Sequence, residues 1–225
     1  MELEPPSVCA LVPMRHDSER VPGKNFRQLN GIPLFGHIVE SLLAVDEITE
    51  VVIDTDSPVV RAYCDEHYPA VVVLERPPHL RDGHIPMTSI IQHDVRETNH
   101  AWYLQTHSTN PFLRSDSIRQ ALRLLSDDRD HDSLFTVTRL NARLYSEDGR
   151  PLNHDPAVLL RTQDLPPIFI ENSCMYIFER EQGLSGRRLG DAPLMYELAG
   201  KEAHDIDTED DWTLAEVLVT IGTGA

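Results

Sequence analysis

The sequence predicts an α/β fold built on a mostly parallel sheet. Short apolar segments of strand length alternate with amphipathic segments of helical periodicity along the first part of the chain. The order strand, helix, strand, helix, strand favours parallel strands joined by right-handed crossovers. At 225 residues the chain can bury a sizeable core, so we expect a single domain over residues 1–225.

The first elements follow from the positions of the apolar residues. Residues 8–12 form an apolar run typical of a buried strand, and Pro13 ends it because proline has no N–H for a sheet ladder. Apolar residues at helical spacing predict a helix over residues 32–43, with Pro33 in its first turn. The next elements are a strand at residues 50–54, a helix at residues 58–67 capped by Thr55, Asp56 or Ser57, and a strand at residues 71–74.

Loops separate the remaining elements. Residues 75–86 are rich in proline, which excludes a regular element there, and we also expect a loop at residues 182–193. Thr88 suits the N-cap of a helix over residues 90–97. The other predicted elements are strands at residues 102–105, 133–139 and 171–178, and helices at residues 115–125 and 209–221.

Residues 140–169 break this rhythm. The segment holds several prolines and the dipeptide Asp148–Gly149, which is typical of a hairpin turn. A long irregular insert in a compact domain is usually functional or an interaction arm.

Charge and cysteine content exclude some classes of function. The formal net charge of −17 disfavours nucleic-acid binding, because little on the surface would neutralise a phosphate backbone. The apolar runs are too short to span a bilayer, so we expect no membrane partner. The three cysteines are far apart and odd in number, which indicates reduced thiols and a cytoplasmic location.

A cationic loop follows the first strand. It contains Arg15, Arg20 and Lys24, with the Ser18 hydroxyl between them and a turn at Pro22–Gly23. Such a loop can bind a polyphosphate, because backbone N–H groups, a hydroxyl and fixed positive charges converge on one anion. The alternative is a solvated surface loop, but three cations in so acidic a chain favour a site.

Two carboxylates near the C-terminus form a second candidate site. Asp205 and Asp207 alternate with Ile206, so on a strand their side chains would share one face. Convergent carboxylates favour a hard cation, most simply Mg²⁺. The alternative is a pair of solvated acids before a helix N-terminus, where Thr208 suits the N-cap.

The cationic loop has the pattern R-x-x-S-x-R-x-P-x-K-N, which resembles the nucleotide-binding loop of the sugar-acid cytidylyltransferases. That family includes the acylneuraminate cytidylyltransferases (CMP-sialic acid synthetases) and the related CMP-Kdo synthetases. Later segments that resemble family motifs are ERPPHL, LQTHSTNPFLR, ENSCMYIF and DIDTEDD. Two residues depart from those motifs: His107 stands near an expected proline, and Ser173 replaces the usual glycine.

The resemblance implies a role for each matching residue. The nucleotide would be bound by Arg15, Ser18, Arg20, Lys24, Asn25, Arg76 and Thr88. The acceptor would be bound by Gln105 and Asn172, with Arg143 and Arg161 as candidates for its carboxylate. Asp205 and Asp207 would hold Mg²⁺, and catalysis would depend on Arg15, Lys24 and Asp207. Arg81 in the same loop is a further candidate for the nucleotide. For both Arg76 and Arg81, the alternative to nucleotide binding is an ion pair with a nearby acid such as Glu75 or Asp82.

The resemblance also implies a fold and a reaction. The fold would be the three-layer α/β/α nucleotidyltransferase fold, with residues 140–170 as a dimerisation and substrate insert of a homodimer. The enzyme would transfer CMP from CTP to an acidic sugar, a nonulosonic acid such as sialic acid or a relative, releasing pyrophosphate in a Mg²⁺-dependent reaction. Two alternatives stay open. One is a nucleotidyltransferase of the same fold that uses another nucleotide or a non-sugar acid acceptor. The other is a non-catalytic nucleotide-binding subunit.

Overall fold

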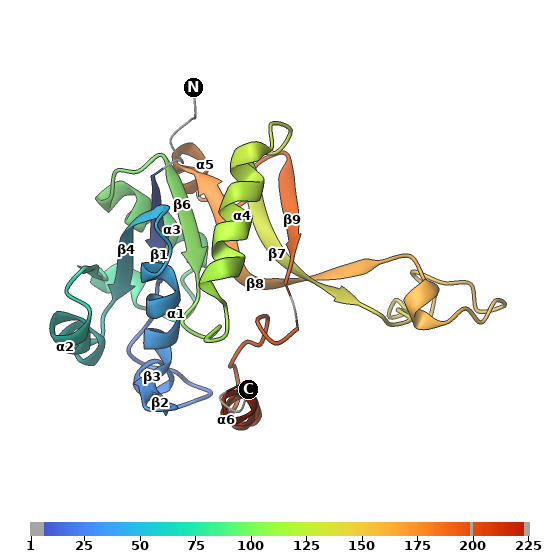
Figure 1. The fold of residues 1–225 in the computed structure, drawn as a ribbon, viewed down its shortest axis with the longest axis horizontal. Coiled ribbons are helices and arrows are strands. Elements are labelled where there is room, and N and C mark those ends of the chain that lie inside the picture. Colours follow the sequence, from blue (N-terminus) through green and yellow to red (C-terminus); the bar gives the residue numbers. More distant parts are fainter. Residues whose placement is uncertain (1–6, 199, 223–225) are drawn as a thin grey trace.

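A seven-stranded sheet forms the centre of the computed structural model, which describes residues 7–198 and 200–222 (Figure 1). The strand order is β5-β4-β1-β6-β8-β7-β9. The neighbouring pairs β5–β4, β4–β1, β1–β6 and β7–β9 are parallel, whereas β8 runs antiparallel to both β6 and β7. The predicted α/β class with a mostly parallel sheet is therefore confirmed.

The strands agree closely with the apolar runs of the sequence. A small separate hairpin, β2 with β3, precedes the first long helix. The strands of the main sheet are β1 (Val8–Leu11), β4 (Ile48–Thr55), β5 (Val71–Glu75), β6 (Trp102–Thr106), β7 (Ser133–Leu140), β8 (Ile168–Glu179) and β9 (Pro193–Glu197). The hairpin strands are β2 (Gln28–Leu29) and β3 (Ile32–Pro33).

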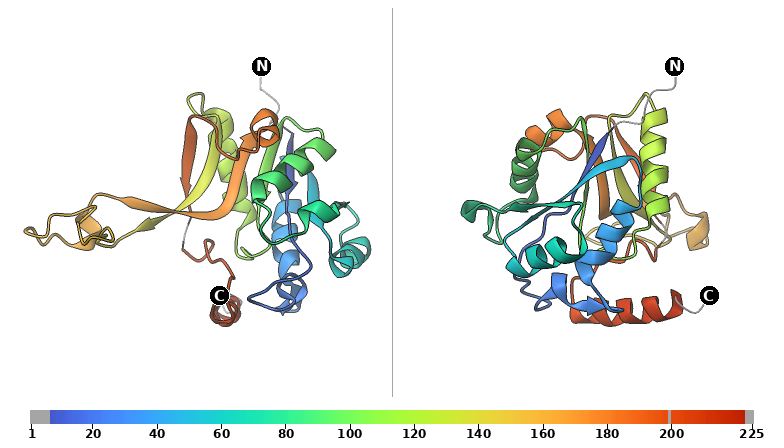
Figure 2. Two further views of the ribbon diagram at one scale, coloured as in Figure 1. Left: turned by 180° about the vertical axis from the view of Figure 1, so that it is seen from behind. Right: turned by 60° about the vertical axis from the view of Figure 1, so that its left-hand side comes forward.

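Helices cover both faces of the sheet, which gives three layers (Figure 2). One face packs against side chains of α1, α2 and α4, and the other against side chains of α3 and α5. Both cores are built from fully buried aliphatic and aromatic residues of the central strands. The helices are α1 (Leu34–Leu43), α2 (Pro58–His67), α3 (Met87–Glu97), α4 (Ser115–Asp127), α5 (Arg180–Leu184) and α6 (Glu209–Gly222).

Two predicted helix starts are corrected by the structure. The helix predicted from residue 32 begins at Leu34, because Ile32 and Pro33 pair with the preceding strand in the small hairpin. Pro33 is consequently the N-cap residue and not part of the first turn. Thr88 is not the N-cap of α3: Pro86 occupies that position, so Thr88 lies exposed in the first turn. In contrast, Ser57 caps α2 as expected, since its side chain accepts a hydrogen bond from the Val60 N–H.

Two other expectations were wrong. The stretch predicted as a loop over residues 182–193 contains most of α5, and β9 follows it as an edge strand. Residues 204–207 are not a strand. The Ile206 N–H donates to the Thr109 carbonyl, but the segment forms no ladder, because a turn precedes it and α6 begins at once.

Residues 141–167 form an arm that projects from the body of the molecule between the outer ends of β7 and β8 (Figure 1). The arm contains one antiparallel bridge, Tyr145 with Pro151, and one short 3₁₀ helix, η3 (Thr162–Asp164). Several of its apolar side chains are exposed, among them Leu159 at 85%.

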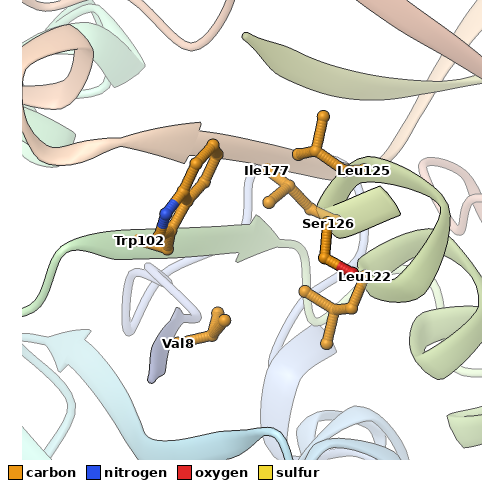
Figure 3. Close-up of a pocket in the computed structure, with 6 residues that line it drawn as sticks. All are labelled: Val8, Trp102, Leu122, Leu125, Ser126 and Ile177. Carbon is orange, nitrogen blue, oxygen red and sulfur yellow. The ribbon is translucent and has the colours of Figure 1, made fainter. Parts of the chain in front are cut away.

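A small apolar gap lies between α4 and the sheet (Figure 3). Its volume of about 30 Å³ is enough for a single water, so it is not a substrate site. The lining residues are Val8, Trp102, Leu122, Leu125, Ser126 and Ile177.

The three cysteines, Cys9, Cys64 and Cys174, are buried and free, as expected. Among the described residues, no helix is long and apolar enough to cross a membrane.

Candidate active site

A polar cleft of about 350 Å³ opens beyond the carboxyl ends of β1 and β6. Its walls come from the loop after β1, from Gly83 and His84, and from residues 107–109. In an open α/β sheet this is the edge where ligands bind, because loops at the strand ends converge there. Its volume is within the range of small-molecule sites.

The loop after β1 is fixed by hydrogen bonds to neighbouring strand ends. The Met14 N–H donates to the Asp54 carbonyl at 2.9 Å, and the His16 N–H donates to Asp56 Oδ1 at 2.7 Å. The Asn25 side chain donates to the Arg15 carbonyl at 2.7 Å and accepts from the Ser108 hydroxyl at 2.7 Å. Asn25 therefore acts here as a brace between the two loops of the cleft.

Gly23 allows the turn within this loop. Its φ of 66° is in the left-handed region, which a side chain rarely adopts. An added Cβ would also lie 2.9 Å from the Phe26 ring. The turn places Lys24 at the start of the 3₁₀ helix η1 (Lys24–Phe26), with its side chain directed to the C-terminal segment.

Arg15, Ser18, Arg20 and Lys24 all line the cleft. Arg20 Nη2 lies 2.8 Å from Asp207 Oδ1, and Lys24 Nζ lies 3.5 Å from the same oxygen. Lys24 Nζ also donates to the Ile206 carbonyl at 2.8 Å. The cationic loop and the acidic segment, close to opposite ends of the sequence, therefore meet at one site.

An apolar cluster holds the acidic segment in place. Ile206 and Trp212 are fully buried against Val21 and Leu29 of the loop region. The Arg27 guanidinium lies 4.1 Å from the centre of the Trp212 ring and forms an ion pair with Glu209 at 2.7 Å. Thr208 caps α6 as predicted, because its hydroxyl accepts from the Asp211 N–H at 3.2 Å.

Asp205 and Asp207 flank the buried Ile206 and keep their carboxylates at the surface, although the segment is not a strand. Desolvation raises the pKa of Asp205, and the charge of Asp207 raises it further, whereas a hydrogen bond from Thr109 lowers it. No third carboxylate, thiol or imidazole of the described residues completes a three-ligand cluster with this pair. Two repelling carboxylates suit Mg²⁺, which commonly takes one or two protein carboxylates plus waters and phosphate oxygens.

Arg76 does not reach the cleft. It is 1% exposed, and its guanidinium forms a buried ion pair with Asp54. Asp94 lies beside this pair, and burial together with the Asp54 charge raises the pKa of Asp94 well above its usual value. Arg81, the neighbouring candidate, pairs with Glu75 at 2.7 Å, so ion pairing within the loop describes its position.

Sequence spacing gave no sign of two clusters of ligand-type side chains. Their members come from separate elements: Cys9, Glu50 and His100 form one cluster, and Asp54, His93 and Asp94 form the other. In the first, His100 Nε2 lies 2.8 Å from Glu50 Oε2. In the second cluster, the Arg76 guanidinium is paired with Asp54 and so occupies the place of a positive charge that a metal ion would otherwise provide.

Gln105 is fully buried at the end of β6, and its amide is engaged on all sides. It donates to the Thr106 carbonyl at 2.9 Å, lies 3.2 Å from His107 Nε2, and accepts from Arg188 Nη1 at 3.0 Å. Burial lowers the pKa of His107 to about 4, and the charges of Arg188 and Lys24 act in the same direction. His107 is therefore neutral at pH 7 and accepts the hydrogen bond from Gln105.

Asn172 and Ser173 directly precede the buried part of β8. Asn172 donates to Thr138 Oγ1 at 3.0 Å and accepts from the Cys174 N–H at 3.2 Å. Ser173 has a φ of 57°, which explains why the resembling motif carries glycine here. The Tyr176 hydroxyl contacts both the Ser173 hydroxyl, at 3.0 Å, and the Glu171 carboxylate.

The remaining candidates lie outside the cleft of this chain. Thr88 is exposed on α3 and does not line the cleft. Arg143 donates to the Leu160 carbonyl, and Arg161 forms an ion pair with Asp164 at 2.7 Å, so both belong to the projecting arm.

The arrangement is suited to binding an anion beside a hard cation. Three cations line the cleft and can neutralise phosphate oxygens. Asp207 pairs with two of them, and Asp205 lies beside Thr109 of the cleft wall. The cleft residues offer no side chain with the properties of a dedicated nucleophile. Chemistry here would rely on positioning and charge neutralisation, as in phosphoryl and nucleotidyl transfer.

Comparisons with known proteins agree with this geometry. The family model described as cytidylyltransferase matches residues 9–209. An N-acylneuraminate cytidylyltransferase A of Danio rerio is 25% identical in an alignment 216 residues long that covers 93% of this chain and 50% of the relative. A CMP-N,N'-diacetyllegionaminic acid synthase of Legionella pneumophila is 25% identical in an alignment 231 residues long that covers 97% of this chain and 98% of the relative.

A solved structure of a CMP:2-keto-3-deoxy-manno-octonic acid synthetase in complex with CTP has the same fold. It superposes with a TM-score of 0.71 at 15% identity, covering 96% of this chain and 99% of that one. The chain spans about half the length of the fish relatives that it matches and nearly the whole length of the Legionella one.

Proposed function

The chain belongs to the cytidylyltransferase family, and we propose that it transfers CMP from CTP to an acidic sugar, releasing pyrophosphate. The observation that carries the proposal is the meeting of the cationic loop with the acidic segment at the carboxyl edge of the sheet, where Asp207 pairs with Arg20 and Lys24. The acceptor class is a nonulosonic acid such as sialic acid or a relative. Support for that class comes from the names of the relatives, one of which has nearly the same length as this chain.

The chain's own residues act on the phosphates in this proposal. Arg15 and Lys24 neutralise the triphosphate and the charge that develops on the leaving pyrophosphate. Asn25 holds Arg15 and Ser108 together across the cleft, because it donates to the Arg15 carbonyl and accepts from the Ser108 hydroxyl. Arg20 and Ser18 complete the wall that faces the phosphates.

Asp205 and Asp207 hold Mg²⁺ in this proposal. The bound ion supplies charge neutralisation between the phosphate oxygens. Asp207 also sets the resting position of the cations, because Arg20 and Lys24 both contact its Oδ1. The aliphatic anchor Ile206 and the Trp212 cluster fix the direction of both carboxylates.

The projecting arm, residues 141–167, is proposed to form a homodimer. Several of its apolar side chains are exposed, including Leu159 at 85%, and a second copy of the chain could cover them. Arg143 and Arg161 lie on this arm, so they serve as acceptor ligands only if the arm reaches a second copy. The three buried free thiols suit a reducing compartment, for which we propose the cytoplasm.

The test is pyrophosphate release from purified protein with Mg²⁺, CTP and a panel of sugar acids, with the CMP-sugar identified by mass. UTP, GTP and ATP serve as nucleotide controls, and reactions without a sugar acid measure background hydrolysis. Release with another nucleotide alone would favour the same-fold alternative. Tight CTP binding without release for any acid would favour a non-catalytic nucleotide-binding subunit.

A further inference from the structure

The loop between α5 and β9 (Figure 1) contains two adjacent arginines, Arg187 and Arg188. Their side chains have different surroundings. Arg187 points to solvent, with 52% of its side chain exposed, and forms an ion pair with Asp191 at 2.8 Å. Arg188 is partly buried and points inward against β8 and β6. Arg187 is thus an ordinary surface arginine paired with a carboxylate, whereas Arg188 is turned toward the sheet.

The inward arginine is held by uncharged groups. Its guanidinium carbon lies 3.7 Å from the centre of the Tyr176 ring, and Nη1 donates to Gln105 Oε1 at 3.0 Å. Within residues 7–198 and 200–222, no carboxylate lies within ion-pairing distance of Arg188. The Glu171 carboxylate nearby is hydrogen-bonded to the Tyr176 hydroxyl.

An unpaired, partly buried guanidinium is costly to keep. Removing a charge from water without an opposite charge is unfavourable, and buried cations are normally paired. This chain has 37 acidic residues against 20 basic ones, so carboxylate partners are abundant. The remaining N–H groups of Arg188 therefore suit an anion that the protein itself does not provide. A planar carboxylate fits the guanidinium fork best.

The position of Arg188 connects it to the cleft. Gln105 accepts from Arg188 and donates to His107, and His107 lines the cleft together with Lys24. The charges of Arg188 and Lys24 both act on the His107 ring. The neutral ring is thus exposed to the charges of two cations: Lys24 of the cationic loop, and Arg188, which stacks on Tyr176 of β8.

We propose that Arg188 binds the carboxylate of the acidic sugar and so determines that the acceptor must be an acid. Gln105 is the positioning residue, because its amide is locked by His107 and Thr106 and holds the guanidinium over Tyr176. The proposal deepens and rests on the proposed function, since it assigns the acceptor subsite of that reaction. It also places the carboxylate ligand within one chain, whereas Arg143 and Arg161 lie on the arm.

The test compares Arg188→Gln and Arg188→Lys with the matched control Arg187→Gln. In pyrophosphate release, Arg188→Gln should raise the KM for the sugar acid by about 10–100-fold and leave the KM for CTP within threefold. Arg188→Lys should recover part of this loss, because it keeps the charge but not the fork. Arg187→Gln should behave as wild type, and thermal unfolding of all variants checks that they are folded.

A binding measurement separates this proposal from the proposed function. Isothermal titration of wild type and Arg188→Gln with free N-acetylneuraminic acid, with Kdo, and with their methyl esters needs no turnover. Binding of an acid but not its ester by wild type, lost in Arg188→Gln, supports Arg188 even if no pyrophosphate is released. Turnover with an unchanged acceptor KM in Arg188→Gln overturns the assignment and leaves the proposed function standing. If wild type neither binds any acid nor turns over, both fail.

Discussion

The neutral histidine in the cleft gives a quantitative prediction about stability and pH. His107 accepts a hydrogen bond from Gln105, and its pKa is lowered from 6.5 to about 4, first by burial and then by the charges of Arg188 and Lys24. In the unfolded chain the ring takes up a proton below about pH 6.5, whereas in the folded protein it stays neutral until about pH 4. Stability is therefore lost as the pH falls through this window.

The size of the loss follows from these two pKa values. Between pH 7 and pH 5 the unfolded state gains most of one proton that the folded state does not bind, which lowers the free energy of unfolding by about 2 kcal/mol. For a chain of 225 residues this corresponds to a decrease in Tm of about 4–8 °C. The other histidines add their own contributions, so a matched variant is needed to isolate this one.

His107→Gln is that variant, because a glutamine carbonyl can accept the hydrogen bond from Gln105 without titrating. Urea unfolding at pH 7 and pH 5 should show a decrease in stability about 2 kcal/mol smaller in the variant than in wild type. NMR of the wild-type imidazole should show no titration near pH 6.5. Equal pH dependence in both proteins, or a ring that titrates at pH 6–7, would refute the assignment.

Two further predictions concern the acidic segment and the arm. Asp207→Asn should lower the free energy of unfolding by about 1 kcal/mol, because its Oδ1 pairs with exposed Arg20 and with Lys24, whose side chain is only 11% exposed. Asp205→Asn should leave Tm unchanged or slightly higher at pH 7, because a carboxyl group with a raised pKa destabilises the folded state when it is ionised. Both variants should lose turnover. Equal Tm changes in the two variants would contradict this reasoning. If the arm forms the proposed dimer, Leu159→Glu should give a monomer in sedimentation, whereas Leu214→Glu on α6 should leave the dimer intact. A monomeric wild type would contradict the proposed dimer.

Much of the fold could be predicted because strands and helices of ordinary length carry their own periodicity. The helix over Pro58–His67 and the strands β1, β4 and β6 are examples, since each buries a regular apolar pattern. The edge strand β9 was missed because it begins with proline and is defined by its pairing with β7, which is distant in sequence. Likewise, the five residues of α5 are too few to show a helical period.

In the candidate site, too, local sequence features could be predicted, whereas contacts between distant parts of the chain could not. The cationic loop could be found from residue type and from its place after a strand, which are local properties. The burial of Arg76 could not be predicted from the sequence, because its ion-pair partner Asp54 lies on a different strand. The inward direction of Arg188 is equally invisible in the sequence, where it cannot be told from Arg187.

Asp207 explains why the two ends of the chain must be treated as one site. Its Oδ1 pairs with two cations of the cationic loop, Arg20 and Lys24, and the neighbouring Ile206 carbonyl accepts from the same Lys24. A carboxylate so placed holds the two cations in fixed positions beside the cleft. The proposed metal role and this resting ion pair therefore compete for one side chain. Asp205, which shares the first role but not the second, is for that reason the proper control for Asp207.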